Sequence, residues 1–274
     1  MPITTMRARR FSITGSGLRI EPFAQHELCH DAFLGGRLVM AQPRKGYRAG
    51  IDPVLLAASI PARSGQSVLD LGCGSGIAAL CLGARVSGLT LAGLEVQPGY
   101  ADLARRNAAA NEIELEVLTG DVATMPRALR QRQFDHVLAN PPFFERGSRT
   151  PASDAGREQG LGESVPLADW VAASARRLAP GGYVTMIQRA ERVPDLMVAM
   201  SKYLGSLELL PLVPRSGRAA RLVLMRGRKG GRAAFHLHDG WCLHTGAAHE
   251  RDGADYTSAT TAVLRDAAAL PFSA

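Results

Sequence analysis

The sequence predicts an α/β fold with a seven-stranded, mostly parallel sheet and helices on both faces. Three observations support this prediction. From Val68 onwards, short apolar runs alternate with helical stretches, as is typical of parallel sheets with crossover helices. A glycine-rich turn follows the first run, between a strand and a helix. Near the end of the pattern, two apolar runs are separated by a short polar loop, which predicts a terminal antiparallel hairpin.

The elements follow from these patterns in chain order. Strands are expected over the short apolar runs 68–71, 89–95, 114–121, 134–139, 183–188, 207–213 and 220–226. Helices are expected over the stretches with helical spacing, 77–84, 98–111, 167–179 and around 194–203. Pro98 stands at a helix start, where proline is favoured. The turn Pro180-Gly181-Gly182 precedes the fifth strand.

The ends of the chain are less regular than its centre. We expect residues 1–30 to be a flexible or accessory segment, 31–228 the main domain, and 229–274 a small C-terminal extension with one strand and one helix. Before Ser67, only a short helix over 52–59 stands out. We expect Asp52 to cap it, with Pro53 at its first position.

Composition limits the class of protein. The 274 residues are 46% hydrophobic and 21% charged, which is enough apolar material for one large domain. No apolar run approaches the roughly 18 residues of a membrane span, and the four cysteines form no CxxC pair. We therefore expect a cytoplasmic protein. The net charge of +7 favours a polyanionic partner.

The segment 70-DLGCGSG-76 has the features of a cofactor loop. Gly72, Gly74 and Gly76 allow close approach, and backbone N–H groups at a helix start can hold an anionic group. Glu95, at the end of the second strand, suits a pair of ribose hydroxyls. Two cofactor classes share this pattern, because GSGIAA, read from Gly74, also fits the dinucleotide fingerprint.

Asp70 separates the two cofactor classes. Its carboxylate would face the same loop and would repel a pyrophosphate, whereas S-adenosylmethionine brings an ammonium, a sulfonium and one carboxylate. An acid at this strand end is therefore compatible with S-adenosylmethionine. Asp121 is a third carboxylate on the same edge of the sheet, and it is expected either beside the adenine of the cofactor or as a helix cap.

At these motifs the chain resembles class I S-adenosylmethionine-dependent methyltransferases over most of residues 40–228. DLGCGSG, the acid in GLEVQ, GDV and NPPF occur in that superfamily's order, which implies a Rossmann-like methyltransferase sheet. The segment 34-LGGRLVMAQPRKGYRAGIDPVLLAAS-59 resembles bacterial methyltransferases that modify the adenosine beside the anticodon of a valine tRNA. This resemblance implies that Tyr47, Arg48 and Asp52 approach the cofactor or target. Loop packing and a helix cap are the alternative.

The motif 140-NPPF-143 predicts the place of the target group. Pro141 biases Asn140 toward an extended conformation at the tip of the fourth strand. The Asn140 amide oxygen and a backbone carbonyl can accept hydrogen bonds from both N–H groups of a primary amine. Pro142 has no N–H, so it leaves the Pro141 carbonyl uncommitted. Phe143 offers a ring on which a planar target can stack. The alternative is a strand ended by prolines, with Phe143 in the core.

An amine conjugated to an aromatic base or an amide is a poor nucleophile. Two acceptors that draw its protons out of plane would localise the lone pair toward the methyl group. Catalysis would then come mainly from orientation and desolvation. In the superfamily, the motif serves amines on adenine, guanine and glutamine, so it indicates the atom type and not the molecule.

Two weaker patterns concern the C-terminal part. No acid lies between Leu209 and His238, and the run is either a phosphate-contacting surface, to which Arg146 and Arg149 could add, or a solvated face. Its basic residues are Arg215, Arg218, Arg221, Arg226, Arg228, Lys229 and Arg232. His236, His238, Cys242 and His244 match no standard zinc spacing, so no metal is expected.

Together these patterns favour an enzyme that transfers a methyl group from S-adenosylmethionine to an exocyclic adenine amine in RNA, with tRNA as the favoured partner. One alternative is methylation of a glutamine side chain in a translation protein. Another is a cofactor-binding module without catalysis, although pure binding would not require Asn140. A dinucleotide oxidoreductase is the last alternative, since Asp70 opposes pyrophosphate.

Overall fold

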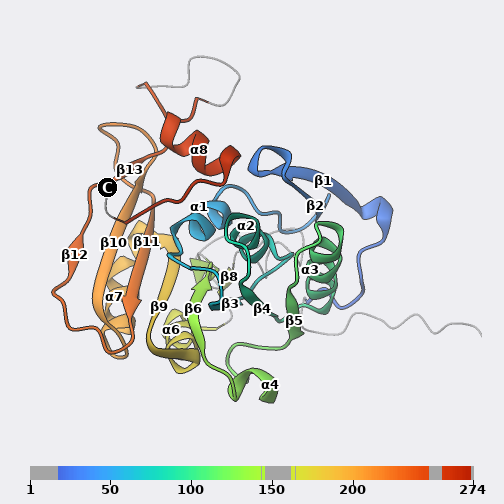
Figure 1. Cartoon of the computed structure of the whole chain (residues 1–274), viewed down its shortest axis with the longest axis horizontal. Helices are drawn as coiled ribbons and strands as arrows, with labels where there is room; N and C mark the ends of the chain where they lie inside the picture. The colour runs from blue at the N-terminus through green and yellow to red at the C-terminus, as the bar shows by residue number, and fades with distance from the viewer. Residues whose placement is uncertain (1–17, 143, 146–161, 164, 247–254, 273–274) are drawn as a thin grey trace, which may run out of the picture.

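One large sheet with helices on both faces forms the body of the protein (Figure 1), which confirms the α/β class. The computed structural model describes residues 18–142, 144–145, 162–163, 165–246 and 255–272. Within them the main sheet has the strand order β12-β10-β11-β9-β6-β3-β4-β5, and β13 also pairs with β10. Its strands are β3 (Ser67–Leu71), β4 (Thr90–Glu95), β5 (Glu116–Thr119), β6 (Phe134–Ala139), β9 (Leu178–Arg189), β10 (Gly205–Val213), β11 (Leu222–Arg228), β12 (His236–Leu237) and β13 (Trp241–Cys242).

Apolar faces of the helices cover both sides of this sheet. One side is covered by α1 (Asp52–Ser59), α2 (Ile77–Arg85), α3 (Pro98–Ala110) and α8 (Ser258–Asp266). The other side is covered by α4 (Arg127–Arg130), α6 (Leu167–Arg177) and α7 (Val193–Ser201). Smaller elements are η1 (Gln25–Glu27), η2 (Leu34–Gly36), η3 (Ala190–Arg192), β7 (Phe144–Glu145) and β8 (Gly162–Glu163). No helix in the described part of the chain is long and apolar enough to cross a membrane.

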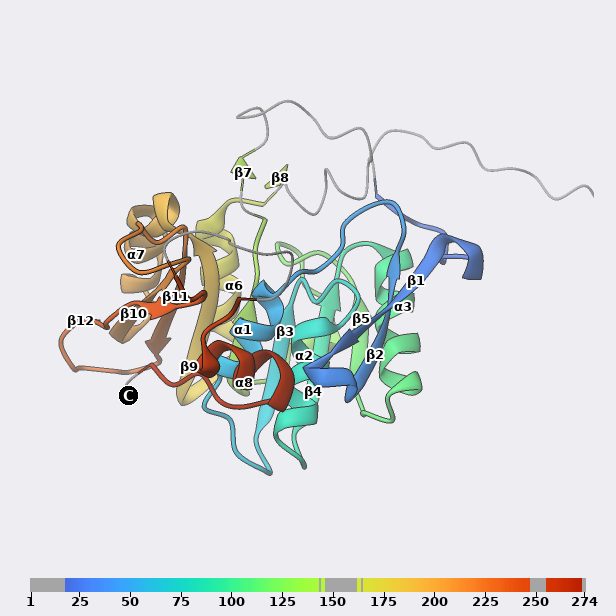
Figure 2. The ribbon, with the colours of Figure 1, turned by 90° about the horizontal axis from the view of Figure 1, so that it is seen from above.

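The strand order places a topological switch beside β3. Strands β5, β4, β3, β6 and β9 are parallel, and their carboxyl ends lie on one edge, toward β7 and β8 in Figure 2. The chain first moves from β3 outward to β5 and then returns to β6 on the other side of β3. Open α/β sheets bind ligands in the crevice outside the carboxyl ends at such a point.

The segment before Ser67 is more regular than predicted. It contains β1 (Leu28–Phe33) and β2 (Leu38–Pro43), which form an antiparallel hairpin. In β1 only Leu28 is buried, so the strand lacks the apolar alternation that would reveal it. The expected cap of α1 is also wrong, because Asp52 is the first residue of that helix and makes no capping hydrogen bond.

Two further expectations need correction. The C-terminal tail adds two short strands, β12 and β13, instead of one, so the predicted hairpin of β10 and β11 does not end the sheet. The turn Pro180-Gly181-Gly182 lies inside β9, where a register shift opposite Phe134 and His136 accommodates it. The local turn residues were recognised, but the pairing of β9 with β6 continues through them.

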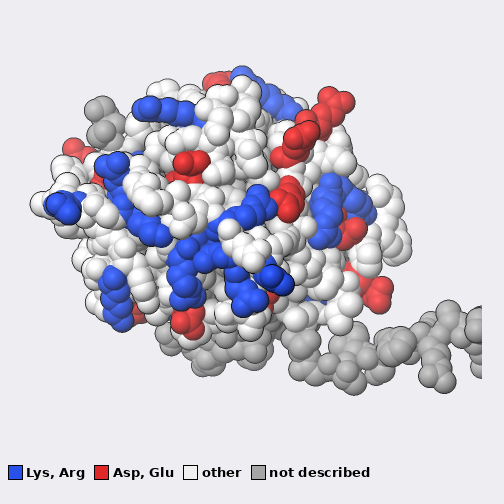
Figure 3. All heavy atoms as spheres, turned by 60° about the horizontal axis from the view of Figure 1, so that its bottom comes forward, with Lys and Arg blue, Asp and Glu red and all other residues white. Residues whose placement is uncertain are grey.

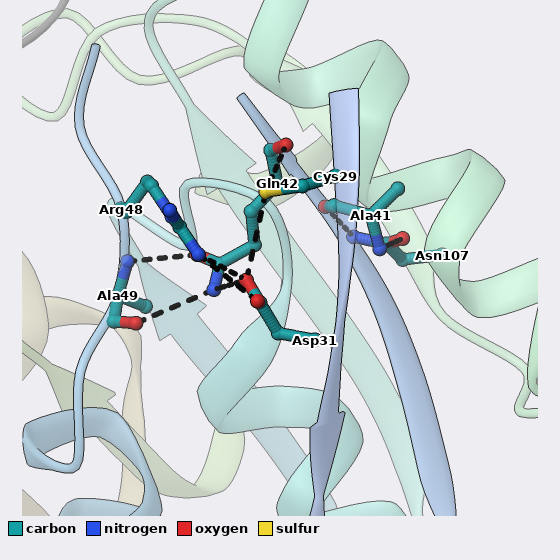
Figure 4. A network of polar contacts seen from close by, with 7 residues as sticks. All are labelled: Cys29, Asp31, Ala41, Gln42, Arg48, Ala49 and Asn107. Atoms are coloured by element: carbon teal, nitrogen blue, oxygen red, sulfur yellow. Dashed lines mark hydrogen bonds and ion pairs between the residues drawn. The ribbon is translucent and has the colours of Figure 1, made fainter. Parts of the chain in front are cut away.

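Asparagine side chains of α3 hold the hairpin against the body. Asn107 Oδ1 accepts from Ala41 N at 2.8 Å, and Nδ2 donates to Ala41 O at 3.1 Å and to Ser75 O at 2.9 Å. Figure 4 shows this amide beside Ala41 of β2. Asn111, one turn later, makes the same pair of bonds to the backbone of Val39. Strand β2, helix α3 and the loop at Ser75 are therefore held together by one buried amide.

We expect Asn107→Ala to lower the free energy of unfolding by about 1–3 kcal/mol or more, because buried backbone groups of Ala41 and Ser75 lose their partner. Urea unfolding followed by circular dichroism measures this difference. Asn111→Ala is the matched control, and it should cost less because Asn111 is less buried. An unchanged unfolding midpoint for Asn107→Ala would show that the amide does not hold the hairpin.

Candidate active site

A cavity opens at the carboxyl edge of the sheet, at the switch between β3 and β6. Its volume is about 1000 Å³ including the open mouth. The ends of β3, β4 and β6, the loop after β5 and the segment between β2 and α1 contribute to its wall. The predicted site residues in this wall are Tyr47, Asp70, Gly72, Gly74, Glu95, Asp121, Asn140 and Pro142.

The glycine loop is bonded to the end of β4. Gly72 N and Cys73 N both donate to Leu94 O, at 2.8 and 3.0 Å, and Gly74 N donates to Glu95 Oε2 at 3.0 Å. These three N–H groups are therefore already used and are not available to hold an anion, contrary to the simplest expectation for a loop at a helix start. Gly76 begins α2 with φ of 87° and lies outside the cavity wall.

Gly72 shows why this loop needs glycine. Its φ is +71°, and a Cβ atom added there would lie 2.6 Å from Trp170 Cη2. The indole of Trp170 thus occupies the space that any other side chain would need. Trp170 also lines the cavity, although in the sequence it reads only as an apolar residue on the face of a helix.

Two buried acids face the cavity from the ends of β3 and β4. Burial raises the pKa of Asp70 to about 7, although Ala79 N donates to its Oδ2 at 3.2 Å. Burial also raises the pKa of Glu95, and hydrogen bonds from Gln97 N and Gly74 N act in the opposite direction. Asp121 Oδ1 accepts locally from Ala123 N at 2.7 Å.

The charge of the wall selects among ligands. In the described part of the chain, the residues that line the cavity include three carboxyl groups, Asp70, Glu95 and Asp121, and no lysine, arginine or histidine. A ligand with an ammonium and a sulfonium would stabilise ionised carboxylates here, whereas a pyrophosphate would be repelled. The wall therefore fits S-adenosylmethionine and disfavours a dinucleotide.

The segment above the cavity is held by α3 and by the hairpin. Tyr47 N donates to Tyr100 Oη at 2.9 Å, and Tyr100 Oη donates to Tyr47 O at 3.1 Å. Burial, with nearby acids, raises the pKa of Tyr47 to about 12. Gln42 Oε1 accepts from Ala49 N at 2.8 Å (Figure 4). These bonds hold the backbone of Tyr47 beside the cavity, and burial keeps its phenol neutral.

Arg48 and Asp52 do not join Tyr47 in the wall. Arg48 is exposed and pairs with Asp31 of β1 at 2.8 Å, as Figure 4 shows. Asp52 lies close enough to Tyr47 for its charge to raise the pKa of that phenol, and burial raises the pKa of Asp52 itself. Of the three residues implied by the resemblance, the structure thus brings only Tyr47 to the cavity.

Asn140 follows β6 and lines the cavity with its amide oxygen unpaired. Its Oδ1 is buried and has no hydrogen-bond partner. The Pro142 carbonyl is contacted by Gln188 Nε2 at 3.5 Å, and no described residue donates to the Pro141 carbonyl. Phe143 lies outside the described residues. The Asn140 amide oxygen is therefore available to an amine at the tip of β6, whereas Pro141 is buried and is not among the residues that line the cavity.

Comparison with known proteins assigns the chain to a family of methyltransferases. The model of the methyltransferase small domain matches residues 49–211. The chain belongs to the methyltransferase small domain family. The predicted class of S-adenosylmethionine-dependent N-methyltransferase is thereby confirmed, with S-adenosylmethionine as its cofactor.

Curated relatives of this methyltransferase carry a common name. A tRNA1(Val) (adenine(37)-N6)-methyltransferase of Porphyromonas gingivalis is 31% identical over 63% of this chain and 71% of its own length. The protein of that name from Aeromonas hydrophila is 30% identical over 72% of this chain and 86% of its own length.

Solved structures show the same fold. A predicted O-methyltransferase of Agrobacterium tumefaciens has a TM-score of 0.65 and 26% identity, covering 80% of this chain and 98% of that chain. The 16S rRNA N2 G1207 methyltransferase of T. thermophilus has a TM-score of 0.51 and 18% identity, covering 74% of this chain and 50% of that chain. The second comparison supports the fold alone.

The basic run of the methyltransferase is divided between two edges of the sheet. In the register of β9 and β11, Leu222 lies opposite Arg189 and Arg228 opposite Tyr183. Residues 214–221 therefore lie at the carboxyl edge with the cavity, and residues 226–232 lie toward the amino edge.

The residues at the amino edge are largely engaged within the protein. Arg226 pairs with Glu208 at 2.8 Å. Lys229 Nζ donates to the carbonyls of Ala175 and Leu178, at 3.1 and 2.6 Å, at the end of α6. Arg226 and Lys229 thus already have partners within the protein, and contact of the basic run with phosphates stays a prediction. At the carboxyl edge of the sheet, called the cavity edge below, Arg218 and Arg221 are exposed. Arg215 at the same edge pairs with Asp255. Arg146 and Arg149 lie outside the described residues.

Positive charge also gathers away from the cavity. Figure 3 shows Lys and Arg side chains across the middle of the face on which α4 lies. At the end of α4, the Arg177 guanidinium donates to the carbonyl of Leu129 at 3.0 Å and to the carbonyl of Arg130. Burial, together with the charges of Arg176 and Arg130, lowers the pKa of Arg177. Net charge therefore does not locate the substrate on this methyltransferase.

Two of the predicted tail histidines, His238 and His244, are engaged with acids, and His236 is exposed and contacts the ring of His238. His238 Nε2 lies 2.9 Å from Glu208 Oε2, and His244 Nδ1 lies 2.7 Å from Asp255 Oδ1. Cys242 Sγ contacts the His244 carbonyl at 3.3 Å. Within the described residues, no group of three or more His, Cys, Asp or Glu side chains could hold a metal ion.

The raised pKa of Asp70 predicts a pH-dependent stability. The unfolded chain releases this proton near the ordinary pKa of 3.8, while the folded protein holds it up to about 7. Folded stability is therefore lost as pH rises through this window. Asp70→Asn keeps an acceptor for Ala79 N and removes the titration.

Without cofactor, the melting temperature of the parent should fall relative to that of Asp70→Asn between about pH 4 and pH 7. Thermal unfolding of both proteins across this range measures the difference. A constant difference would mean that Asp70 is ionised throughout.

Proposed function

We propose that this methyltransferase methylates the exocyclic amine of an adenine in RNA, and that the RNA is a tRNA. The observation that carries the proposal is the buried, unpaired Asn140 Oδ1 in the cavity wall. An unsatisfied buried acceptor is costly, and an amine N–H of the target would satisfy it.

S-adenosylmethionine supplies an electrophilic methyl group when it is bound. The protein orients the amine: Asn140 Oδ1 accepts a hydrogen bond from one N–H group, and the Pro141 carbonyl accepts a hydrogen bond from the other. Both bonds hold the amine with its lone pair toward the methyl group. Because neither acceptor is a strong base, the rate enhancement comes from orientation in a site that excludes water.

The choice of adenine and tRNA is supported by the curated relatives, which are named for N6 methylation of adenine 37 in a valine tRNA. Exposed cations at the carboxyl edge of the sheet and in the segment before Tyr47 are compatible with RNA phosphates. Arg218 and Arg221 lie at the cavity edge, and Arg44 and Lys45 precede Tyr47 in the segment above the cavity. A tRNA substrate places the enzyme in the cytoplasm. No relative reported above favours a glutamine substrate, and a module without catalysis would not require the Asn140 acceptor.

Asn140→Ala should reduce turnover by about two orders of magnitude or more, as losses of oriented polar groups do. Affinity for S-adenosylhomocysteine should stay close to that of the parent, because the amide serves the target amine. Methyl transfer to unmodified tRNA and calorimetry with S-adenosylhomocysteine give the two quantities. Turnover at the parental rate would remove the acceptor role.

RNA contact is tested by two double variants that remove equal charge. Arg218→Gln with Arg221→Gln changes the cavity edge, and Arg63→Gln with Arg228→Gln changes the amino edge. Binding to RNA weakens with salt by a slope of roughly 0.7–0.9 per phosphate contacted. We expect the first pair to lower tRNA affinity and the salt slope, and the second pair to leave both near the parental values.

A salt titration of tRNA binding for the parent and both double variants makes this comparison. Equal slopes in all three proteins would show that the cavity-edge arginines do not contact phosphate. Absence of tRNA binding by the parent would favour the glutamine substrate instead.

A further inference from the structure

The indole N–H group of Trp170 has no part in the catalytic role proposed for residues 140–142. The residue lies in α6, lines the cavity and is 8% exposed. Its ring packs on the backbone of Gly72, where a Cβ atom would lie 2.6 Å from Cη2. The indole Nε1 is buried and has no hydrogen-bond partner. A buried N–H donor without an acceptor destabilises the protein, so a ligand atom that accepts this bond would remove the cost.

Three backbone N–H donors of the glycine loop already have acceptors within the protein. Gly72 N, Cys73 N and Gly74 N are committed to Leu94 O and Glu95 Oε2. These three N–H groups are therefore not available to an anionic ligand group near Gly72. Trp170 Nε1 belongs to the side chain that is packed directly on this loop.

We propose that Trp170 Nε1 donates a hydrogen bond to the carboxylate of the amino-acid part of S-adenosylmethionine. Among the described residues, the cavity wall contains three carboxyl groups and no cationic side chain. Such a wall suits the ammonium and sulfonium of the cofactor but opposes its carboxylate. A neutral donor in a buried setting binds a carboxylate strongly, because hydrogen bonds to ionised groups exceed neutral ones.

The position of Trp170 agrees with this assignment. Gly72 follows β3 directly, two residues after Asp70, whose carboxyl suits the cofactor ammonium. Asn140 lies at the end of the neighbouring strand β6. Trp170 thus packs at the end of β3, on the loop that follows Asp70. The inference rests on the identity of the cofactor and not on the identity of the methylated substrate.

Trp170→Phe tests the donor with little change of shape, because phenylalanine keeps a flat ring for Gly72 and lacks the N–H. The probes are S-adenosylhomocysteine, which has the carboxylate, and 5′-methylthioadenosine, which lacks the whole amino-acid part. We expect S-adenosylhomocysteine to bind about tenfold or more weakly, as for a lost hydrogen bond to a charged group. Affinity for 5′-methylthioadenosine should be unchanged. Calorimetry measures both dissociation constants.

Trp241→Phe is the matched control. Its Nε1 donates to Thr260 Oγ1 at 3.0 Å, and it does not line the cavity. Removing this N–H should affect stability without changing the ratio of the two affinities.

Equal weakening of both ligands by Trp170→Phe would show that the ring acts only by packing, and this would overturn the proposal. Unchanged affinity for both would overturn it as well, and a raised Michaelis constant for tRNA would then assign the donor to the target base. Because these binding measurements use no RNA, they stand even if tRNA proves not to be the substrate.

Discussion

The cavity depends on the attachment of the glycine loop to the end of β4. Two N–H groups of the loop share the Leu94 carbonyl, and a third binds the Glu95 carboxylate. These bonds set the spacing between the two strand ends that supply Asp70 and Glu95. They also bring Gly72 close enough to α6 for the indole of Trp170 to pack on its backbone. The cofactor side of the site is thus held together by contacts within the protein.

Burial gives this arrangement a preference for cations. Asp70 and Glu95 are both almost fully buried, and burial raises the pKa of each carboxyl. A cationic ligand would repay that desolvation by favouring the ionised forms. The target side differs, because Asn140 offers a neutral acceptor and not a charge. One cavity therefore combines a charge-selective half with a half that selects by hydrogen-bond direction.

The central part of this structure could be predicted because its signals are local. Buried parallel strands such as β3 and β6 appear as short apolar runs, and the acids and Asn140 stand directly at their ends. The hairpin could not be predicted, because its stability comes from amides of α3 more than sixty residues away.

Other features depend on pairing that the sequence does not display. The basic run is divided between the two edges of the sheet because of the register of β11 with β9. The positions of the arginines in the sequence do not reveal this register. Trp170 reads as an ordinary apolar residue of a helix, and only its contact with Gly72 reveals its place beside the cofactor loop.

The amides of Asn107 and Asn111 also close an exposed edge of the β1–β2 hairpin. Two residues along a strand span roughly 6.8 Å and four residues along a helix roughly 6 Å, so amides four apart on α3 can meet alternate residues, Ala41 and Val39, of β2. An isolated hairpin presents unpaired N–H and C=O groups that recruit strands from other molecules. Here a helix supplies those partners with side chains, and this edge of the protein is thereby protected against aggregation.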